Sequence, residues 1–254
     1  VPLAAQRFMA VVKADAYGHG AVRVAQHIEP VVDALAVAFT EEAVALREAG
    51  INGPLLILEG PHTDSDLALA SKLDLWPVIH SDEQLEWCKT MGTNLSQAWI
   101  KIDTGMHRLG FAAERYAGIR DALLSYGIRE ITAMSHLALA EEPDDALTRA
   151  QLRSWEETVR DGTHTTSLHN SAATQQALSA PSDWVRVGYA LYGGQEKGLQ
   201  SPLRLRPAMR LSSSVIALRH VPTGGSVGYG GRWTAQRDSV IATLSVGYGD
   251  GYPW

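Results

Sequence analysis

The sequence predicts an α/β protein: a (β/α)8 TIM barrel followed by a partial all-β C-terminal domain. Short apolar runs rich in β-branched residues alternate with segments of helical period, which is typical of parallel strands joined by crossover helices. Eight such runs occur, and eight parallel βα units close into a barrel. Beyond about Gly193 the period of the apolar residues becomes two, which favours a separate β-sheet.

The barrel prediction rests on strand candidates separated by helix candidates. In EEAVALREAG, Ala43 and Leu46 share one helical face, and Gly50 favours the end of the helix. In SDEQLEWCK, Ser81 and Gln84 predict a capping box, in which two backbone donors are satisfied reciprocally. The strand candidates, in chain order, are Phe8–Lys13, Ala34–Phe39, Leu55–Glu59, Leu75–His80, Ala98–Asp103, Ile131–His136, Thr165–His169 and Trp184–Val187.

The last part of the chain predicts strands and no helices. The stretches PLRLRPAMRLSSSVIALRHV and DSVIATLSVGYG alternate apolar and polar residues with period two. The polar segment Gly193–Ser201 predicts a junction, so we expect a barrel over residues 1–193 and a β-domain over residues 202–254. A β-domain of this size would be small and exposed at its edges, and we therefore expect that the chain is truncated.

Composition excludes several classes of protein. With 254 residues, 45% hydrophobic and 20% charged, the chain is typical of soluble globular proteins. The net charge of −6, with no cluster of Lys or Arg, argues against nucleic acid as a partner. No apolar run approaches the roughly 18 residues of a membrane helix. The single Cys88 excludes an internal disulfide and favours a cytoplasmic location, although the start at Val1 suggests that a segment has been removed.

Polar side chains stand at the predicted carboxyl ends of the barrel strands, where the catalytic groups of such barrels gather. A lone lysine or histidine at such a place is ordinarily a solvated or structural group, so only the joint placement predicts a site. The loops after the last two barrel strands also commonly bind phosphate. The residues at these ends are Lys13, Lys101, Asp103, His136, Asn170, Ser171 and Arg186.

The segment AVVKADAYGHG, residues 10–20, resembles the pyridoxal-phosphate signature of the alanine racemases. The resemblance continues in the same order through KIDTGMHRLGF, MSH, SLHNSAA, DWVRVGYALYG, SVGYGGRWTA and LSVGYGDGYP. Chance does not easily produce seven collinear matches, and several of them resemble the catabolic, proteobacterial branch of the family. The resemblance implies a fold-type-III enzyme that interconverts L-alanine and D-alanine, with the same barrel and β-domain.

The resemblance also implies a two-base mechanism. Lys13 would hold pyridoxal 5'-phosphate as an imine and act as the base on one face of Cα, and Tyr229 would act on the other face. A tyrosine titrates near 10 in isolation and needs a cationic neighbour, for which the family supplies the arginine that matches Arg108. In the family this tyrosine serves the partner subunit's active site, which implies a homodimer that binds a small amino acid.

Further residues match supporting positions of the family. Arg186 matches the arginine that binds the pyridine nitrogen and keeps it unprotonated, and His136 matches the histidine that donates toward Arg186. Lys101 corresponds to a lysine that is often carbamylated, because an unmodified amine would face Arg108 as a like charge. Tyr248 matches a tyrosine at the substrate entrance, with core packing as its alternative. We expect structural roles for Asp15 and Asp103.

The resemblance assigns the phosphate to the loops after the seventh and eighth strands. Ser171 would offer its hydroxyl and amide, and Tyr17 its phenol. Two residues depart from the family pattern: His169 replaces the usual residue, and Tyr189 replaces an aliphatic one. We expect the backbone contacts to survive both changes. The phosphate-binding set is Tyr17, Asn170, Ser171, Gly188 and Tyr189.

Three alternatives stay open from the sequence. The strand and helix that precede the lysine motif in the family, and a C-terminal portion with a Met-Asp loop, are missing here, so the chain is alternatively a folding fragment. A serine or broad-specificity amino-acid racemase would have the same fold. A non-catalytic pyridoxal-phosphate-binding barrel would lack the β-domain.

Overall fold

The computed structural model describes residues 6–253 with gaps at 92–94, 163, 196–198 and 200–202. The chain divides into two compact units, Val1–Ala208 and Met209–Trp254, which we call the barrel unit and the β unit. Residues 196–198 and 200–201 of the predicted junction Gly193–Ser201 lie outside the described residues.

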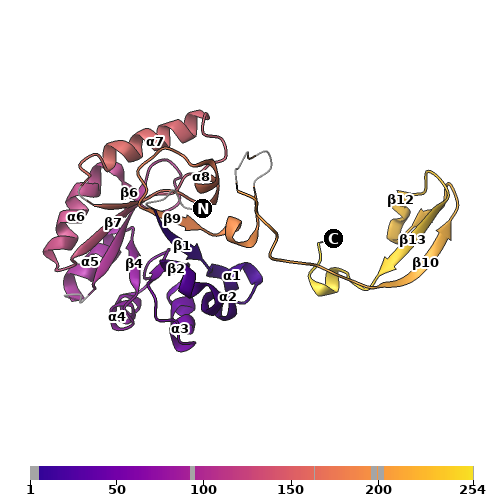
Figure 1. Ribbon diagram of the computed structural model, residues 1–254, viewed down its shortest axis with the longest axis horizontal. Helices are drawn as coiled ribbons and strands as arrows, with labels where there is room; N and C mark the ends of the chain where they lie inside the picture. Colours follow the sequence, from indigo (N-terminus) through magenta and orange to yellow (C-terminus); the bar gives the residue numbers. More distant parts are fainter. Residues whose placement is uncertain (1–5, 92–94, 163, 196–198, 200–202, 254) are drawn as a thin grey trace. The chain divides into compact units, whose positions relative to one another are not determined.

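Parallel strands of the barrel unit close into a ring (Figure 1). Each strand pairs with the next, β4 pairs directly with β5, and β9 returns to β1. A short strand, β6 (Phe111–Ala112), lies beside β5. The predicted eight-stranded parallel barrel is confirmed within the described residues. The ring strands are β1 (Arg7–Val11), β2 (Ala34–Val37), β3 (Leu55–Ile57), β4 (Trp76–Ile79), β5 (Gln97–Asp103), β7 (Glu130–Met134), β8 (Thr165–Ser167) and β9 (Trp184–Val187).

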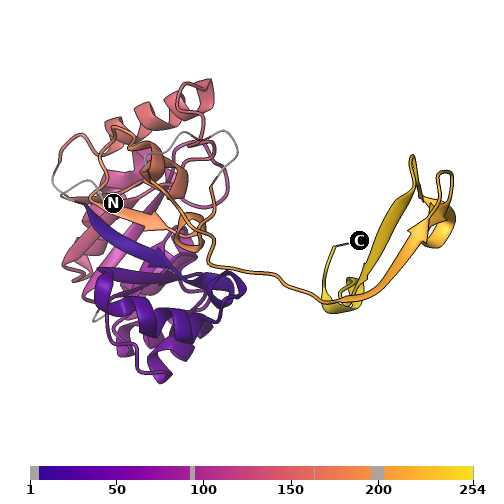
Figure 2. The same ribbon diagram turned by 45° about the vertical axis from the view of Figure 1, so that its right-hand side comes forward.

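Helices lie outside the ring in both views (Figures 1 and 2). The predicted helical face is confirmed, because Ala43 and Leu46 are buried and Gly50 follows with φ of 89°. None of the described helices is both long and apolar enough to cross a bilayer. The helices are α1 (Lys13–Gly18), α2 (Ala21–Ile28), α3 (Thr40–Glu48), α4 (Asp64–Lys72), α5 (Asp82–Met91), α6 (Tyr116–Ser125), α7 (Ala146–Thr158) and α8 (Ser171–Gln176), with 3-10 turns η1 (Glu29–Val31), η2 (Ala113–Arg115) and η3 (Tyr189–Tyr192).

The predicted capping box of α5 is only half formed. Ser81 Oγ accepts from Gln84 N (3.3 Å), as predicted. Gln84 Oε1, however, accepts from His80 N (2.7 Å), and the Gln84 amide donates to Pro61 O (2.9 Å). The reciprocal half of the prediction is wrong because the buried Gln84 side chain is recruited to tie the end of β4 to the loop after β3.

Period-two alternation stacks the inner face of the barrel in layers. Inward side chains of the ring include a tryptophan layer, in which the Trp99 and Trp184 ring centroids lie 5.8 Å apart. Two residues further along the same strands, on the same face, stand Lys101 and Arg186. Lys101 and Arg186 therefore lie closer to the carboxyl ends of the strands than the tryptophan layer, which fills the interior of the barrel.

The β unit contains only strands and short 3-10 turns among its described residues. β10 (Val215–Val221) pairs antiparallel with β13 (Ser239–Leu244), and β11 (Ser226–Val227) pairs with β12 (Trp233–Thr234). The predicted all-β character is confirmed, but the predicted strands are too long. Residues 203–214 form no strand, because a period-two pattern becomes a strand only where a partner satisfies its backbone groups. The 3-10 turns are η4 (Tyr229–Gly231) and η5 (Tyr248–Asp250).

Candidate active site

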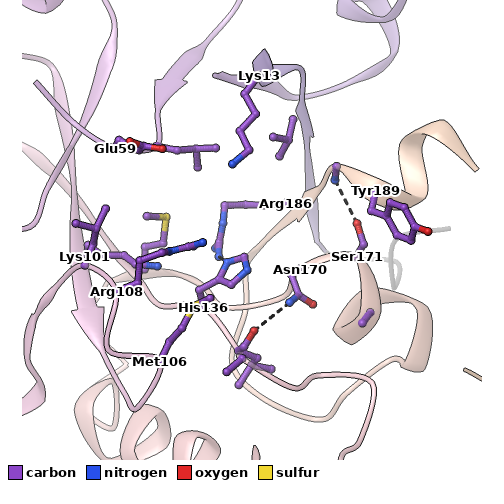
Figure 3. Close-up of a pocket in the computed structure, with 18 of the residues that line it drawn as sticks. Lys13, Glu59, Lys101, Met106, Arg108, His136, Asn170, Ser171, Arg186 and Tyr189 are labelled. Carbon is purple, nitrogen blue, oxygen red and sulfur yellow. Dashed lines mark hydrogen bonds between the residues drawn. The ribbon is translucent and has the colours of Figure 1, made fainter. Parts of the chain in front are cut away.

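A pocket of about 570 Å³ lies at the carboxyl ends of the barrel strands (Figure 3). Figure 3 shows Lys13 reaching into the pocket toward Arg186 and His136, with Asn170 and Ser171 beside them. The pocket brings together all the site residues that the sequence predicts within the barrel. They are Lys13, Tyr17, Lys101, Arg108, His136, Asn170, Ser171, Arg186, Gly188 and Tyr189.

Lys13 begins a turn of left-handed backbone immediately after β1. Ala14, Asp15, Ala16 and Tyr17 have φ values between 52° and 55°. For residues with a Cβ this conformation costs about 1–2 kcal/mol each, so it persists only where the surroundings enforce it. Glu42 Oε1 accepts from Ala14 N (2.6 Å), and Asp15 Oδ1 accepts from Ala21 N (2.7 Å). The predicted strand therefore ends at Val11, before Lys13, and the expected structural role of Asp15 is confirmed.

Arg186 is the most tightly held cation of the pocket. Its side chain is buried and donates to Ser167 Oγ, to Ser135 O (2.6 Å) and to His136 Nδ1 (3.3 Å). Burial, and then the charge of Arg108, lower the pKa of Arg186 to about 9, which still leaves it charged at neutral pH. These three acceptors hold the guanidinium in one position on the inner face of the barrel.

The hydrogen bond between His136 and Arg186 runs opposite to the prediction. A guanidinium has only donors, so His136 Nδ1 accepts from Arg186, and the expectation that His136 donates toward Arg186 is wrong. Burial lowers the pKa of His136 well below its ordinary value, and the charges of Arg186, Lys101 and Arg108 lower it further. His136 is therefore neutral at neutral pH, which matches its role as an acceptor.

Lys101 is a buried amine among like charges. Burial lowers its pKa well below the ordinary value, the charges of Arg186 and Arg108 lower it further, and Asp103 opposes the shift. Asp103 itself holds the loop that leads to Arg108: its carboxylate accepts from the amides of Gly105 (2.9 Å) and His107 (3.0 Å). The expected structural role of Asp103 is thereby confirmed.

Backbone donors gather at the other end of the pocket, where α8 begins. Asn170 caps this helix, since its Oδ1 accepts from Ala173 N (3.0 Å). Ser171 Oγ accepts from Gly188 N and from Ala190 N, both at 3.2 Å. One hydroxyl thus ties the start of α8 to the start of η3, and a loop rich in N–H groups results.

Gly188 is needed because Tyr17 lies against it. A Cβ on Gly188 would stand 2.4 Å from Tyr17 Oη, closer than any side-chain contact allows. Burial raises the pKa of Tyr17, so its phenol stays a hydrogen-bond donor at neutral pH. Because Gly188 has no side chain, the Tyr17 phenol can lie against the loop that begins at Gly188, which we call the donor-rich loop.

Sequence reasoning missed the residues that support this site. Ser135, Ser167 and Thr104 are buried, and Thr104 Oγ1 lies 2.8 Å from Ser135 Oγ. Gln151 of α7 donates to His136 O (3.1 Å) and accepts from Ala138 N (2.9 Å). The available signal was a serine directly before His136 in MSH and two residues before His169 in SLHNSAA.

The two predicted tyrosines of the β unit are exposed. Tyr229 is 93% exposed in η4 between Gly228 and Gly230, which have φ of 75° and 71°. Tyr248 is 78% exposed in η5, so core packing, its alternative role, is wrong for this chain. Within the described residues, no cluster of three His, Cys, Asp or Glu side chains is arranged to hold a metal ion.

Comparisons with known proteins give one family for both units. The family profile "Alanine racemase, N-terminal domain" matches residues 2–196, and "Alanine racemase, C-terminal domain" matches residues 208–254. The alanine racemase of Pseudomonas entomophila is 43% identical, over 99% of this chain and 71% of that protein. The catabolic alanine racemase of Pseudomonas aeruginosa is 42% identical, over 97% and 70% of the two chains.

Solved structures give the same result. The biosynthetic alanine racemase from Pseudomonas aeruginosa superposes with a TM-score of 0.89 and 40% identity, over 99% of this chain and 71% of that one. The alanine racemase from Bartonella henselae with covalently bound pyridoxal phosphate gives a TM-score of 0.80 and 27% identity, over 99% and 71% of the two chains.

Proposed function

This chain belongs to the alanine racemase family, whose members are pyridoxal-phosphate-dependent isomerases, and from that premise we propose that it interconverts L- and D-alanine with Lys13 and Tyr229 as its two bases. The observation that carries the proposal is the position of the signature lysine, which reaches into a pocket lined by Arg186, Arg108 and Lys101. The family resemblance inferred from the motifs is confirmed by the matching family profiles and relatives.

The residues of the pocket fit pyridoxal phosphate. The molecule needs an amine for its aldehyde, donors for its phosphate and a partner for its ring nitrogen. Lys13 supplies the amine and Arg186 the partner of the ring nitrogen. Ser171, whose Oγ accepts from Gly188 N (3.2 Å) in this structure, would supply its hydroxyl and amide, and Tyr17, which lies against Gly188, would supply its phenol. Asn170 and Tyr189 complete this phosphate end of the pocket.

When bound, pyridoxal phosphate supplies an electron sink for the charge left on Cα after proton removal. Arg186 weakens that sink, because a residue that is charged at neutral pH leaves the ring nitrogen without a proton. With a weaker electron sink, the rate of racemisation depends more strongly on the two bases. Lys13 removes or returns the proton on one face of Cα.

Tyr229 acts on the opposite face, and it comes from a second copy of the chain. Its phenol is 93% exposed, so the fold of its own unit leaves it available to another surface. A tyrosine needs a nearby cation to lose its proton near neutral pH, and Arg108 of the barrel is such a cation. We therefore propose a homodimer that shares its active sites, with Tyr248 at the substrate entrance.

We further propose that Lys101 is carbamylated. Burial beside Arg108 and Arg186 lowers the pKa of this amine and so favours its neutral form, which is the form that reacts with carbon dioxide. The resulting anion would hold Arg108 in place and offset the positive charges of Arg108 and Arg186. We also propose a cytoplasmic location, which the single described cysteine, the free Cys88, supports.

The β unit favours a racemase over a non-catalytic pyridoxal-phosphate barrel, because such a barrel has no counterpart of Tyr229. The test is the visible spectrum of the chain with pyridoxal phosphate, before and after D- or L-alanine, together with a D-amino-acid assay. We expect a yellow protein, a spectral change with either enantiomer, and racemisation. A yellow protein without racemisation would support the carrier, and a chain that stays colourless would support a folding fragment. Faster turnover of serine would move the assignment to a broad-specificity racemase.

A further inference from the structure

Tyr192 makes ring contacts with two residues of the turn that follows Lys13. Its ring centroid lies 4.9 Å from that of Tyr17 and 4.7 Å from that of His19, and the His19 ring is stacked with an interplanar angle of 21°. Tyr192 ends η3, the 3-10 turn that begins directly after Gly188. We call the three rings of Tyr17, His19 and Tyr192 the aromatic clamp. The clamp joins the donor-rich loop to the lysine turn.

Polar contacts anchor the clamp on both sides of Lys13. Tyr192 Oη donates to Val11 O (3.1 Å), two residues before the lysine. His19 Nδ1 lies 3.0 Å from Ala16 O and 3.2 Å from Tyr17 O. Because both partners are carbonyl oxygens, Nδ1 carries the proton and donates. Burial raises the pKa of Tyr192, which keeps its phenol a donor.

The turn requires such support because its backbone is unfavourable. Residues 14–17 are left-handed, and none of them is glycine. Within the turn, Ala16 N donates to Val12 O (2.9 Å) and Gly20 N donates to Asp15 O (2.9 Å). Contacts within the turn do not fix its position relative to the rest of the pocket. The contacts of Tyr192, like the bond from Ala14 N to Glu42 Oε1, come from a distant part of the chain and tie the turn to the rest of the barrel.

We propose that Tyr192 and His19 are positioning residues, which hold the left-handed turn so that Lys13 and Tyr17 stand ready in the pocket before the cofactor arrives. They act through Tyr17 and the backbone. The ordering of the turn is independent of the proposed function, whereas the effect on cofactor capture rests on it.

Two variants test the clamp. Tyr192→Phe removes the hydrogen bond to Val11 O and keeps the ring, while Tyr192→Leu removes both contacts. Amide hydrogen exchange of the chain without cofactor measures the order of the turn. A titration with pyridoxal phosphate measures how tightly the cofactor binds. We expect exchange at residues 16–20 to rise by about tenfold or more in Tyr192→Leu and by less in Tyr192→Phe. The dissociation constant of pyridoxal phosphate should rise in the same order.

Tyr116→Leu is the matched control, since Tyr116 is a buried tyrosine of α6 that does not line the pocket. It should lower Tm without raising exchange at residues 16–20 relative to the rest of the barrel. If Tyr192→Leu raises exchange there no more than Tyr116→Leu does, the clamp is overturned. A wild-type chain that binds no pyridoxal phosphate would contradict the proposed function, while the exchange data would still decide the clamp.

Discussion

The barrel unit and the β unit hold their proposed bases in opposite ways. In the barrel, Lys13 reaches into a pocket that also holds the buried Lys101 and Arg186, and Arg186 donates to three acceptors. In the β unit, Tyr229 is 93% exposed, and Ala235 is the only buried hydrophobic residue among the described residues 209–253. The barrel unit fixes its site by its own packing, whereas the β unit presents Tyr229 on a 3-10 turn with almost no buried core behind it.

This difference indicates which part of the structure sets the electrostatic surroundings of each proposed base. Burial and neighbouring charges already shift the pKa values of Lys101, His136 and Arg186 within the barrel. Electrostatics of this kind require a low local dielectric, which an exposed phenol does not have. The proposed role of Tyr229 therefore depends on a surface outside its own unit, for which we propose the barrel of a second copy of the chain.

The largest expected effect is that of Lys13→Ala. Loss of the amine should remove covalent attachment of pyridoxal phosphate and lower racemisation by more than the factor of about 10²–10⁴ that a single base contributes. Borohydride reduction followed by peptide mapping measures the attachment. Lys72→Ala, on the exposed face of α4, is the control and should keep both properties. A reduced cofactor found on another lysine would refute the assignment.

Tyr229→Phe should have the next largest effect on rate and almost none on stability. We expect racemisation to fall by about 10²–10⁴, because one base is lost, while the free energy of unfolding changes by less than about 0.5 kcal/mol. Deuterium washout should be impaired far more from one enantiomer than from the other. Tyr126→Phe, at the end of α6, is the control. Equal impairment of both enantiomers would argue against bases on opposite faces.

Gly188→Ala tests how closely the barrel site is packed. The new Cβ would stand 2.4 Å from Tyr17 Oη, so the phenol must move away from the donor-rich loop. We expect pyridoxal phosphate to bind about tenfold more weakly, with a small change in Tm, because the clash falls on the flexible end of a side chain. Gly118→Ala in α6, whose Cβ would meet nothing within 4 Å, should leave binding unchanged. Unchanged affinity in Gly188→Ala would exclude the phosphate role of Tyr17.

The last expected effect is on stability rather than on rate or binding, and it concerns acidification of the barrel. Burial, and then the charge of Arg186, lower the pKa of His169 from 6.5 to about 4. The unfolded chain thus binds the proton more readily than the folded one, so stability rises with pH between about 4 and 6.5. Acidification through this pH range should lower the free energy of unfolding by about 3 kcal/mol through His169 alone.

Urea unfolding at pH 7 and pH 4 measures this cost. His169→Gln should flatten the pH dependence of the free energy of unfolding, whereas His27→Gln, at an exposed position of α2, should not. If both variants keep the wild-type slope, other groups control the acid stability of the barrel.

Much of the fold could be predicted because local patterns dominate it. Runs such as Ala34–Val37 are buried on both faces, and buried parallel strands appear in a sequence as continuous apolar stretches. The left-handed turn at residues 14–17 could not be predicted, since alanine and tyrosine give no signal for it. The predicted reciprocal bond of the α5 capping box was wrong for a related reason. The Gln84 side chain bonds instead to His80 N and Pro61 O, and Pro61 is distant in sequence.

The sequence by itself determined the family, the ring of alternating strands and helices, and the residue types at the ends of the strands. These follow from periodicity and from motifs, which are local properties of a chain. Only the tertiary structure decided that His136 accepts from Arg186, that Lys101 is a buried amine among cations, and that Tyr192 stacks on the lysine turn. Protonation and strain depend on burial and on neighbours from distant segments, and no local pattern encodes them.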